Sequence, residues 1–575
     1  MKNMIKILAA VALALCFSGC TSLLDVTNPN RFTDEQMTEF IGSSPEAEKQ
    51  VLSGLVGKLP ECVNFMEAKM NGGYANSGEW ESWKEFERFC QSGDVVEGDS
   101  QHPGDFAKWY QNLPSNTYWR TDDNVENYGY YLGPVFKYGF AQKALDFLTK
   151  EKVRQYPTMK AGRAQALTIK AMAYLALMER YTDFQDVASK DKQGWPVYDK
   201  FAYNAPMEPW SVADTWAWIN EAFKEAVDLF KGSNLGSGGY TIGKESTEIH
   251  DIDCAIAQYY RCRAALDVKD WATAIEAGND LLSHYPSFIK ADDYGMKATL
   301  LESVNRRASL NETTTSAKNP GKWTGTDFNA LQNAFYNLEK NPEAIFGEAR
   351  GSVSWFWSLR GQSVNTFPGL NPLKKLGTPD GAFYQMDQKL AEAMTDADCR
   401  KACLLPEAFP AAHFYVAQGT DTTWYHFPMP KYTSLKWAAS SAIQEPAHSN
   451  DKQTSDNIYL RSSAVLLMVA EAYAQSGQDA QAKALLDKLL AARTLPGNPA
   501  MTCANTMAGK SALDMVKLQW RLEMWGEGDW AFFNQKRWGV RNERGSNHWS
   551  KSLIPAQGFI WEIPRQERQG NPYWK

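Results

Sequence analysis

The sequence predicts a mostly α-helical protein in which paired helices stack into a scaffold that carries a long, irregular insertion with little strand. Three observations lead to this prediction. Apolar residues recur at helical spacing in about 134–286 and 458–530. A small-residue helix pair occurs twice, in "CRAALDVKDWATAIEAGNDLLSHYP" and in "VAEAYAQSGQDAQAKALLDKLLAAR". Between the two pairs, residues 287–457 lose the helical period and are rich in Pro, Gly, Asn and Trp.

The first helical hairpin is predicted shortly after residue 134. One apolar stripe consists of Phe136, Phe140, Ala144, Phe147 and Leu148, and the next consists of Ala164, Leu167, Ala171, Leu175 and Met178. The stretch "YPTMKAG" separates the two stripes and contains the Pro and Gly that break helices. Because the break is short, we expect the two helices to pack antiparallel.

A further helix is predicted to begin at "PWSVAD". Ser211 can cap the first turn and Asp214 can reciprocate three residues later. The apolar stripe of this helix is Trp216, Ile219, Phe223, Val227 and Phe230. The glycines of "GSNLGSGG" end it.

The repeated helix pair looks like a tetratricopeptide (TPR) unit, in which small residues allow close packing and a final Pro, here Pro286, closes the unit. In the second copy the stripe is Ala482, Leu485, Leu486 and Leu489. One pair cannot bury its own apolar face, so several must stack. We therefore expect TPR-like hairpins that form a right-handed superhelical scaffold.

The irregular residues form two zones, about 60–133 and 287–457. A structureless loop as long as the second zone is improbable inside a compact domain, so we expect an ordered insertion that rests on the helices. Functional groups are often carried by loops that a rigid frame holds in place. Both zones are therefore the candidate ligand-binding parts.

The N-terminus has the layout of a secretory signal in residues 1–19, with Lys2 and Lys6 before an apolar run. That run is too short to span a bilayer as a helix. The stretch "CFSGC" resembles a bacterial lipobox, which implies that Cys20 is lipidated and becomes the mature N-terminus. Acyl chains on one residue would tether the protein to a membrane without a spanning helix.

Bulk composition excludes several classes of protein. The net charge of −7 and the pI of about 5.7 provide no basic surface for nucleic acid. Of nine cysteines, Cys16 and Cys20 belong to the leader, and the other seven are too scattered for a disulfide framework. Cys399 and Cys403 lack further metal ligands at a suitable spacing, so we expect buried thiols and neither metal nor cofactor.

Four segments together point to a known family. They are "LLDVTNPNRFTDEQ" after the lipobox, "RAQALTIKAMAYLALMERYTD", "YLRSSAVLLMVAEAYAQSG", and "RLEMWGEGDWAFFNQKRWG" with "IPRQERQGNP". With these segments the chain resembles the nutrient-binding outer-membrane lipoproteins of the SusD/RagB family. The matches to the C-terminal signature of the family are Arg521, Glu523, Glu527, Gly528, Arg537 and Trp538. Asn534 stands about where the family usually has Asp.

The resemblance implies one SusD-like domain over residues 20–575, with a C-terminal signature in 521–575 that packs against the TPR helices and is not catalytic. It also implies a location on the outer membrane, lipid-anchored and facing the medium. The expected activity is capture of an oligosaccharide or polysaccharide and its delivery to a SusC-like TonB-dependent transporter. In the RagB branch the ligand would be a peptide.

The aromatic content, with 21 Trp, 25 Tyr and 27 Phe, suits a sugar ligand. Pyranose rings stack their C–H faces on indole or phenol rings, while polar side chains hydrogen-bond the hydroxyls. We expect the ligand-binding residues among tryptophans outside helical stripes: Trp80, Trp83, Trp323, Trp355 and Trp357, then Trp109, Trp119 and Trp424. The polar candidates are Asn76, Asn365 and Arg360, whereas Trp216, Trp271, Trp520 and Trp538 are assigned to packing.

Two other classes of function remain open at this point. A surface glycoside hydrolase would need two carboxylates across a sugar, for which Glu343 with Glu348, or Glu79 with Glu81, are the candidates. Acidic residues this near in sequence are usually solvated, and no motif of a common hydrolase, zinc protease or nucleotide-binding protein is present. A TPR scaffold that binds only protein is the third class. We expect a binding protein and not an enzyme.

Overall fold

The structure is a computed structural model, which divides into two compact units, Met1–Gly57 and Lys58–Lys575. It describes residues 34–41, 43–57, 59–60, 62, 91–97, 121–123, 125–200, 206–242, 252–298, 333–335, 338–348, 384–407, 409–418, 421–429, 431–436, 457–528 and 530–575. In the first unit, α2 (Asp34–Ile41) packs against α3 (Pro45–Val56). The hydroxyl of Ser44 caps α3 by accepting a hydrogen bond from the backbone N–H of Ala47.

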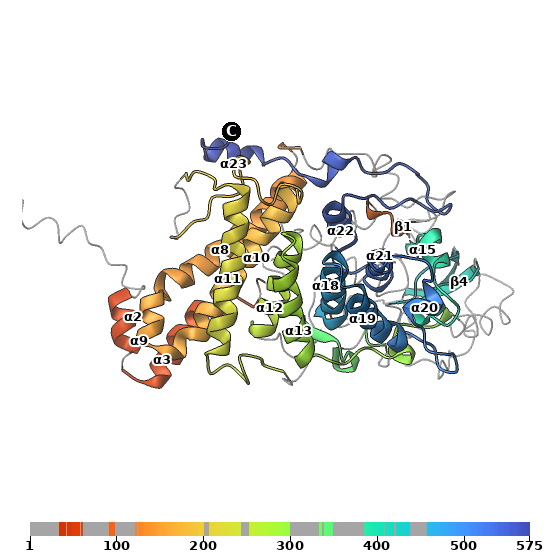
Figure 1. Cartoon of the computed structure of the whole chain (residues 1–575), viewed down its shortest axis with the longest axis horizontal. Helices are drawn as coiled ribbons and strands as arrows, with labels where there is room; N and C mark the ends of the chain where they lie inside the picture. The colour runs from red at the N-terminus through yellow and green to blue at the C-terminus, as the bar shows by residue number, and fades with distance from the viewer. Residues whose placement is uncertain are drawn as a thin grey trace, which may run out of the picture. The chain divides into compact units, whose positions relative to one another are not determined.

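The second unit is built on a row of helices that pack on their neighbours in turn (Figure 1). The row consists of α8 (Val125–Phe147), α10 (Lys160–Tyr181), α11 (Val212–Lys231), α12 (Cys254–Asp267), α13 (Trp271–His284), α18 (Ser462–Gln475), α19 (Asp479–Ala492) and α21 (Ala512–Glu523). Helix α10 is buried along almost its whole length. The prediction of a mostly helical fold is confirmed.

The predicted helix boundaries are close to those observed. The break "YPTMKAG" holds the short 3-10 helix η2 (Pro157–Met159), but an additional helix, α9 (Lys150–Gln155), lies before it. Ser211 caps α11 as expected, since its hydroxyl accepts a hydrogen bond from Asp214 N at 3.1 Å and donates one to the Asp214 carboxylate at 2.6 Å.

The two TPR-like pairs are direct neighbours although about 200 residues separate them in the sequence. Helix α13 of the first pair packs on α18 of the second, and Asn279 Nδ2 donates a hydrogen bond to the hydroxyl of Tyr473 at 3.2 Å. Gly278 lies in close contact with α18, because a Cβ at this position would meet Val469 Cγ2 at 2.2 Å. The intervening chain therefore leaves the row after α13 and returns to it at α18 (Figure 1).

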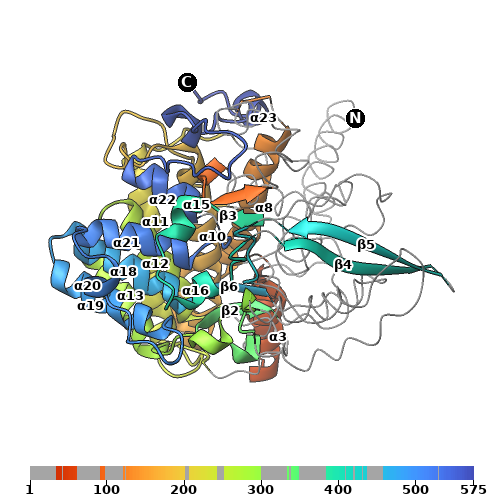
Figure 2. The ribbon, with the colours of Figure 1, turned by 90° about the vertical axis from the view of Figure 1, so that its right-hand side faces the viewer.

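Among the residues that the structure describes, strands form three antiparallel pairs, which lie toward the end of the row at α18–α21 (Figure 2). They are β1 (Val95–Glu97) with β3 (Tyr384–Met386), β2 (Ala344–Glu348) with β6 (Asn457–Arg461), and β4 (Phe409–Gln418) with β5 (Asp421–Met429). The last pair is a long hairpin in the zone that the sequence predicts to be irregular. Its β-branched and aromatic residues around "GTD" are the signal for it.

Short elements complete the second unit. They are η3 (Ala291–Asp293), η5 (Leu338–Lys340), α15 (Gln388–Glu392), α16 (Cys399–Ala402), α20 (Cys503–Thr506), α22 (Trp530–Trp538), η8 (Ala556–Phe559) and α23 (Arg565–Gly570). The six cysteines within the described ranges are unpaired in disulfides and buried, as predicted. They are Cys62, Cys254, Cys262, Cys399, Cys403 and Cys503.

The C-terminal helix α22 packs against α12 and α18 through buried charges. Arg537 of α22 donates to Glu471 of α18 at 2.9 Å and to Asp267 of α12 at 3.1 Å. Glu471 also accepts the indole N–H groups of Trp520 at 3.0 Å and Trp538 at 2.7 Å. One carboxylate thus joins α18, α21 and α22.

Asp267 has an unusual environment within this cluster. Burial is the main cause that raises its pKa, and the neighbouring Glu179 adds to the effect against the attraction of Arg537. The pKa of Asp267 therefore lies well above its ordinary value. Because the pKa is raised in the folded state, the stability it contributes is present at low pH and is lost as the pH rises through the folded value.

We predict that Gly278→Ala lowers the free energy of unfolding by about 1–3 kcal/mol, because the methyl group would push α13 from α18. Urea denaturation measures the change. Gly570→Ala is the control, since a Cβ at that position would have no atom within 4 Å, and it should change stability by less than about 0.5 kcal/mol. Equal effects of the two substitutions would contradict close packing at Gly278.

We also predict that Asp267→Asn flattens the pH dependence of stability. Asn cannot ionise, so the variant should lose less stability than the parent between about pH 5 and about pH 9. Urea denaturation at both pH values tests this, with the exposed Asp292→Asn as the control. A variant whose stability falls with pH as steeply as the parent's would show that Asp267 does not carry the effect.

Candidate functional site

A buried ionic cluster holds together the parts of the chain that flank the irregular zones. Arg461 at the end of β6 donates to Glu343 at 2.6 Å and to Glu523 at 2.7 Å. Arg493, which follows α19, donates to the same two carboxylates, each at 2.7 Å. These four residues are at most 1% exposed. Glu343 is shared by these two guanidinium groups, and Glu523 by the same two and by Arg400, which donates to it at 3.2 Å.

Glu527 extends the cluster to the end of β5 and the residues after it. Arg461 donates two hydrogen bonds of 2.7 Å to its carboxylate, and the Lys436 ammonium is also paired with it. Lys436 further donates to the backbone carbonyls of Glu523 and Trp525, both at 3.1 Å, near the C-terminal end of α21. Glu527 therefore bonds residues that precede and follow segment 437–456.

The electrostatics of the cluster follow from burial and from these pairs. Burial alone would raise the pKa of Glu523, but the guanidiniums of Arg493 and Arg461 outweigh it and hold that pKa well below its ordinary value. The pKa of Glu527 is lowered against burial by Arg461 and Lys436 in the same way. Burial lowers the pKa of Lys436 to about 8. The carboxylates are thus ionised at neutral pH and available as anchors.

The two short strand pairs bring together residues that flank different segments of the irregular zones. We call the described residues next to such a segment its roots. Glu97 of β1 is opposite Tyr384 of β3, so the residue before 98–120 lies beside the residue after 349–383. Glu348 of β2 is opposite Asn457 of β6, so the residue before 349–383 lies beside the residue after 437–456. The strand pairs therefore join three segments at their bases.

The remaining roots are tied by single hydrogen bonds. Met296 N donates to Leu435 O at 3.1 Å, and Asn333 Nδ2 donates to Lys436 O at 3.0 Å. Both ends of segment 299–332 are thereby attached next to the start of segment 437–456. The cluster, the strand pairs and these bonds form one frame beneath four segments.

The C-terminal residues hold the roots of the first irregular zone. Arg521 donates to Asp94 at 2.8 Å, and Gln535 donates to Ser92 O at 2.9 Å, which fixes the residues before 98–120. At the other end of that segment, Arg565 N donates to Asp122 O at 2.7 Å. The signature region thus anchors both ends of the segment that carries Trp109 and Trp119.

Most of the sequence-predicted site residues lie outside the described ranges. They are Cys20, Trp80, Trp83, Trp109, Trp119, Trp323, Trp355, Trp357, Asn76, Asn365 and Arg360. Trp424 lies in β5, opposite Tyr415 of β4. Of the tryptophans assigned to packing, Trp216 and Trp520 are buried, while Trp271 and Trp538 are half-buried. The frame therefore fixes the positions of the residues that flank the segments.

Glu343 requires a correction of the sequence interpretation, which treats it as one of a solvated acidic pair. It is fully buried, and its carboxylate accepts hydrogen bonds from Arg461, Arg493 and the backbone N–H of Ile289. A carboxylate paired in this way is unsuited to act as the acid or base of a glycosidase. Its partners lie 118 and 150 residues away in the sequence, so no local pattern reveals them.

The described ranges also bear on metal binding and on membrane insertion. Within them no three His, Cys, Asp or Glu side chains are arranged to hold a metal ion. No helix in this part of the chain combines the length and the apolar character needed to cross a bilayer.

Comparisons with known proteins agree with this architecture. Residues 407–568 match the model of the SusD family. A SusD-like carbohydrate-binding protein from Bacteroides vulgatus superposes with a TM-score of 0.55 at 17% identity, over 91% of this chain and 96% of that one. A SusD superfamily protein from Bacteroides fragilis gives 0.57 at 15% identity, over 93% and 99%.

A surface glycan-binding protein A from Bacteroides uniformis has a TM-score of 0.52 at 13% identity, over 92% of this chain and 99% of that one. No curated protein sequence matches the chain. The helical row with rooted, irregular segments defines the SusD-like class of fold. The region that matches the model of the SusD family contains the anchoring residues Lys436, Arg461 and Glu527.

We predict that Glu527→Gln lowers the free energy of unfolding by about 3–5 kcal/mol, because it leaves buried positive charge without its partner. Urea denaturation measures the loss. The double variant Glu527→Gln with Lys436→Met removes one of the stranded charges and should recover part of it. The single variant Lys436→Met completes the cycle. If the double variant loses as much stability as the two single variants lose together, or more, the pairing of Lys436 with Glu527 does not contribute as described.

Proposed function

We propose that this protein is a cell-surface glycan-binding lipoprotein that captures oligosaccharide or polysaccharide and passes it to a SusC-like TonB-dependent transporter. Cys20 would carry the lipid that tethers the chain to the outer membrane. The observation that carries the proposal is the common frame, in which strand pairs and the ionic cluster bring together the residues that flank the tryptophan-containing segments.

The chemistry of the rooted segments supports a sugar ligand. They contain Trp109, Trp119, Trp323, Trp355 and Trp357, and Trp80 and Trp83 precede the described residue Gln91. Indole rings offer the apolar faces on which pyranose rings stack. The names of structural relatives, a SusD-like carbohydrate-binding protein and a surface glycan-binding protein, point to the same ligand class.

Binding without catalysis is the simplest mechanism for such a site. Stacking removes the C–H face of the sugar from water, while its hydroxyl rim keeps hydrogen bonds to polar side chains and solvent. A rigid frame lowers the entropy lost on binding because the bases of the segments are already ordered. Release to a transporter then requires no covalent step.

Affinity gel electrophoresis against a panel of polysaccharides, with a parallel assay for reducing ends, tests capture. Retardation without release of reducing ends is the expected result. Release would favour a glycoside hydrolase. Failure of the whole panel, together with recovery of a TonB-dependent barrel in a pull-down, would favour a peptide-binding protein of the RagB type or a protein-binding scaffold.

We predict that Trp83→Ala and Trp355→Ala each weaken binding of the retained oligosaccharide about three- to tenfold, the range expected for one lost aromatic stacking contact. Isothermal titration calorimetry measures the affinities. The matched control is Tyr573→Ala, an exposed aromatic residue beyond α23. Unchanged affinity in both tryptophan variants would remove these two positions from the binding site.

A further inference from the structure

Tyr432 has a strained backbone in the turn that follows β5. Its φ is +68°, and Lys269 is the only other residue besides glycine with positive φ among the described residues. Lys269 follows the last turn of α12, where a left-handed residue commonly ends a helix. Tyr432 lies at no helix end. A bulky aromatic residue in this region is a genuine outlier, and such outliers concentrate at functional sites.

The backbone of Tyr432 is held on both sides. Its N–H donates to Leu405 O at 2.9 Å, and its carbonyl accepts a hydrogen bond from Met386 N at 3.0 Å. These two bonds connect it to the residues after α16 and to β3. The conformation is therefore fixed by neighbouring segments, and it presents the side chain at a defined position beside the root of segment 349–383.

The side chain of Tyr432 combines an anchored ring with a polar edge. The ring is half-buried and packs against the apolar cluster that contains Leu390 and Leu404. Its hydroxyl donates to Glu392 Oε1 at 2.7 Å, and the ammonium of the exposed Lys431 lies 4.7 Å from the ring centroid. An aromatic ring bordered by a carboxylate and an ammonium is the composition expected of a sugar platform.

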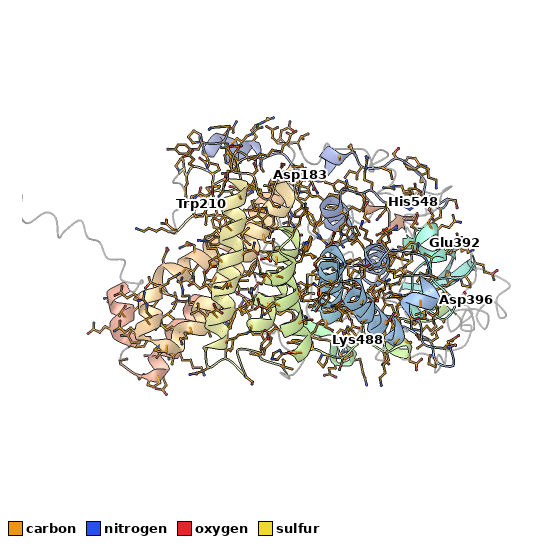
Figure 3. The ribbon with its side chains drawn as sticks, in the orientation of Figure 1. Asp183, Trp210, Glu392, Asp396, Lys488 and His548 are labelled. Carbon is orange, nitrogen blue, oxygen red and sulfur yellow. The ribbon has the colours of Figure 1, made fainter. Side chains whose placement is uncertain are left out.

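The polar edge continues along α15. Gln388 Nε2 donates to Glu392 at 2.9 Å, and Gln388 Oε1 accepts a hydrogen bond from Ser546 N at 3.0 Å. The hydrogen bonds from Tyr432 and Gln388 lower the pKa of Glu392, so this exposed carboxylate is ionised and can accept further hydrogen bonds. Figure 3 shows Glu392 on the same side as His548, whose imidazole lies 3.1 Å from Asp387 at the start of α15.

We propose that Tyr432, Lys431, Glu392 and Gln388 form a further sugar-binding surface, which takes one neutral pyranose unit of the captured glycan. The sugar stacks on the ring of Tyr432 and moves the flexible Lys431 side chain to the rim. Its hydroxyls donate to Glu392 and accept hydrogen bonds from Lys431 and Gln388. The inference rests on the proposed glycan ligand, but its residues are separate from the tryptophans assigned above.

Calorimetry with the full-length chain tests the surface. The probes are hexasaccharides of glucose, xylose and mannose, and the variants are Tyr432→Gly, Tyr432→Phe and Glu392→Gln. Glycine adopts positive φ freely, so Tyr432→Gly relieves the strain while it removes the ring. We expect Tyr432→Gly to bind the recognised probe about three- to tenfold more weakly. Tyr432→Phe keeps the ring and should lose less.

Lys269→Gly is the matched control, because it relieves positive φ at the other strained residue without touching the surface. It should leave the affinity within about twofold of the parent. Glu392→Gln changes only an exposed side chain, so it remains informative if Tyr432→Gly fails to fold. Affinities within about twofold of the parent for both Glu392→Gln and the folded Tyr432 variants would overturn the inference.

The outcome is distinguishable from a failure of the proposed function. If the parent binds no probe and no polysaccharide of the panel, the proposal of glycan capture is wrong, and the proposal of a sugar-binding surface at Tyr432 is wrong as well. If the parent binds and only Trp83→Ala or Trp355→Ala weakens binding, glycan capture stands and the Tyr432 surface is wrong. Loss of affinity in the Tyr432 variants, without loss in Lys269→Gly, supports the surface.

Discussion

The pairing of Glu343 and Glu523 with Arg461 and Arg493 is the interaction on which the rest of the structure depends. It connects Glu343, which lies between α13 and α18, and Arg461, which immediately precedes α18, to Arg493 and to Glu523 of α21. The paired residues are 30 to 150 positions apart in the sequence. Removing one of these buried charges would leave its partners with less compensation, although Arg461 also pairs with Glu527 and Glu523 also pairs with Arg400. These ion pairs hold in place the residues that precede segment 349–383 and those that follow segment 437–456.

The ionic frame connects the row of helices to the residues at which several long segments leave and re-enter it. Helices stacked in a row expose mostly polar faces, and flexible loops alone would lose much entropy on binding. Here Glu527 bonds both sides of segment 437–456, and the pairs β1–β3 and β2–β6 place neighbouring roots side by side. The C-terminal residues thus have a structural role, because Arg521 and Gln535 hold the residues that precede segment 98–120.

The sequence predicts the repetitive part of this structure well. Helical period and small residues locate α12–α13 and α18–α19, and the cap at Ser211 follows from its neighbours. The contact of α13 with α18 and the burial of Glu343 escape prediction, because both depend on residues far apart in the chain. Tyr432 escapes as well, since its positive φ is imposed by hydrogen bonds to Leu405 and Met386.

Hydrogen exchange, followed by mass spectrometry with and without a retained oligosaccharide, tests whether the segments held by the frame bind the glycan. We expect the ligand to slow exchange in residues 63–90, 98–120, 299–332 and 349–383, while the helical row from α10 to α13 exchanges as before. Slowed exchange confined to that helical row, with no change in the four segments, would show that the glycan binds elsewhere.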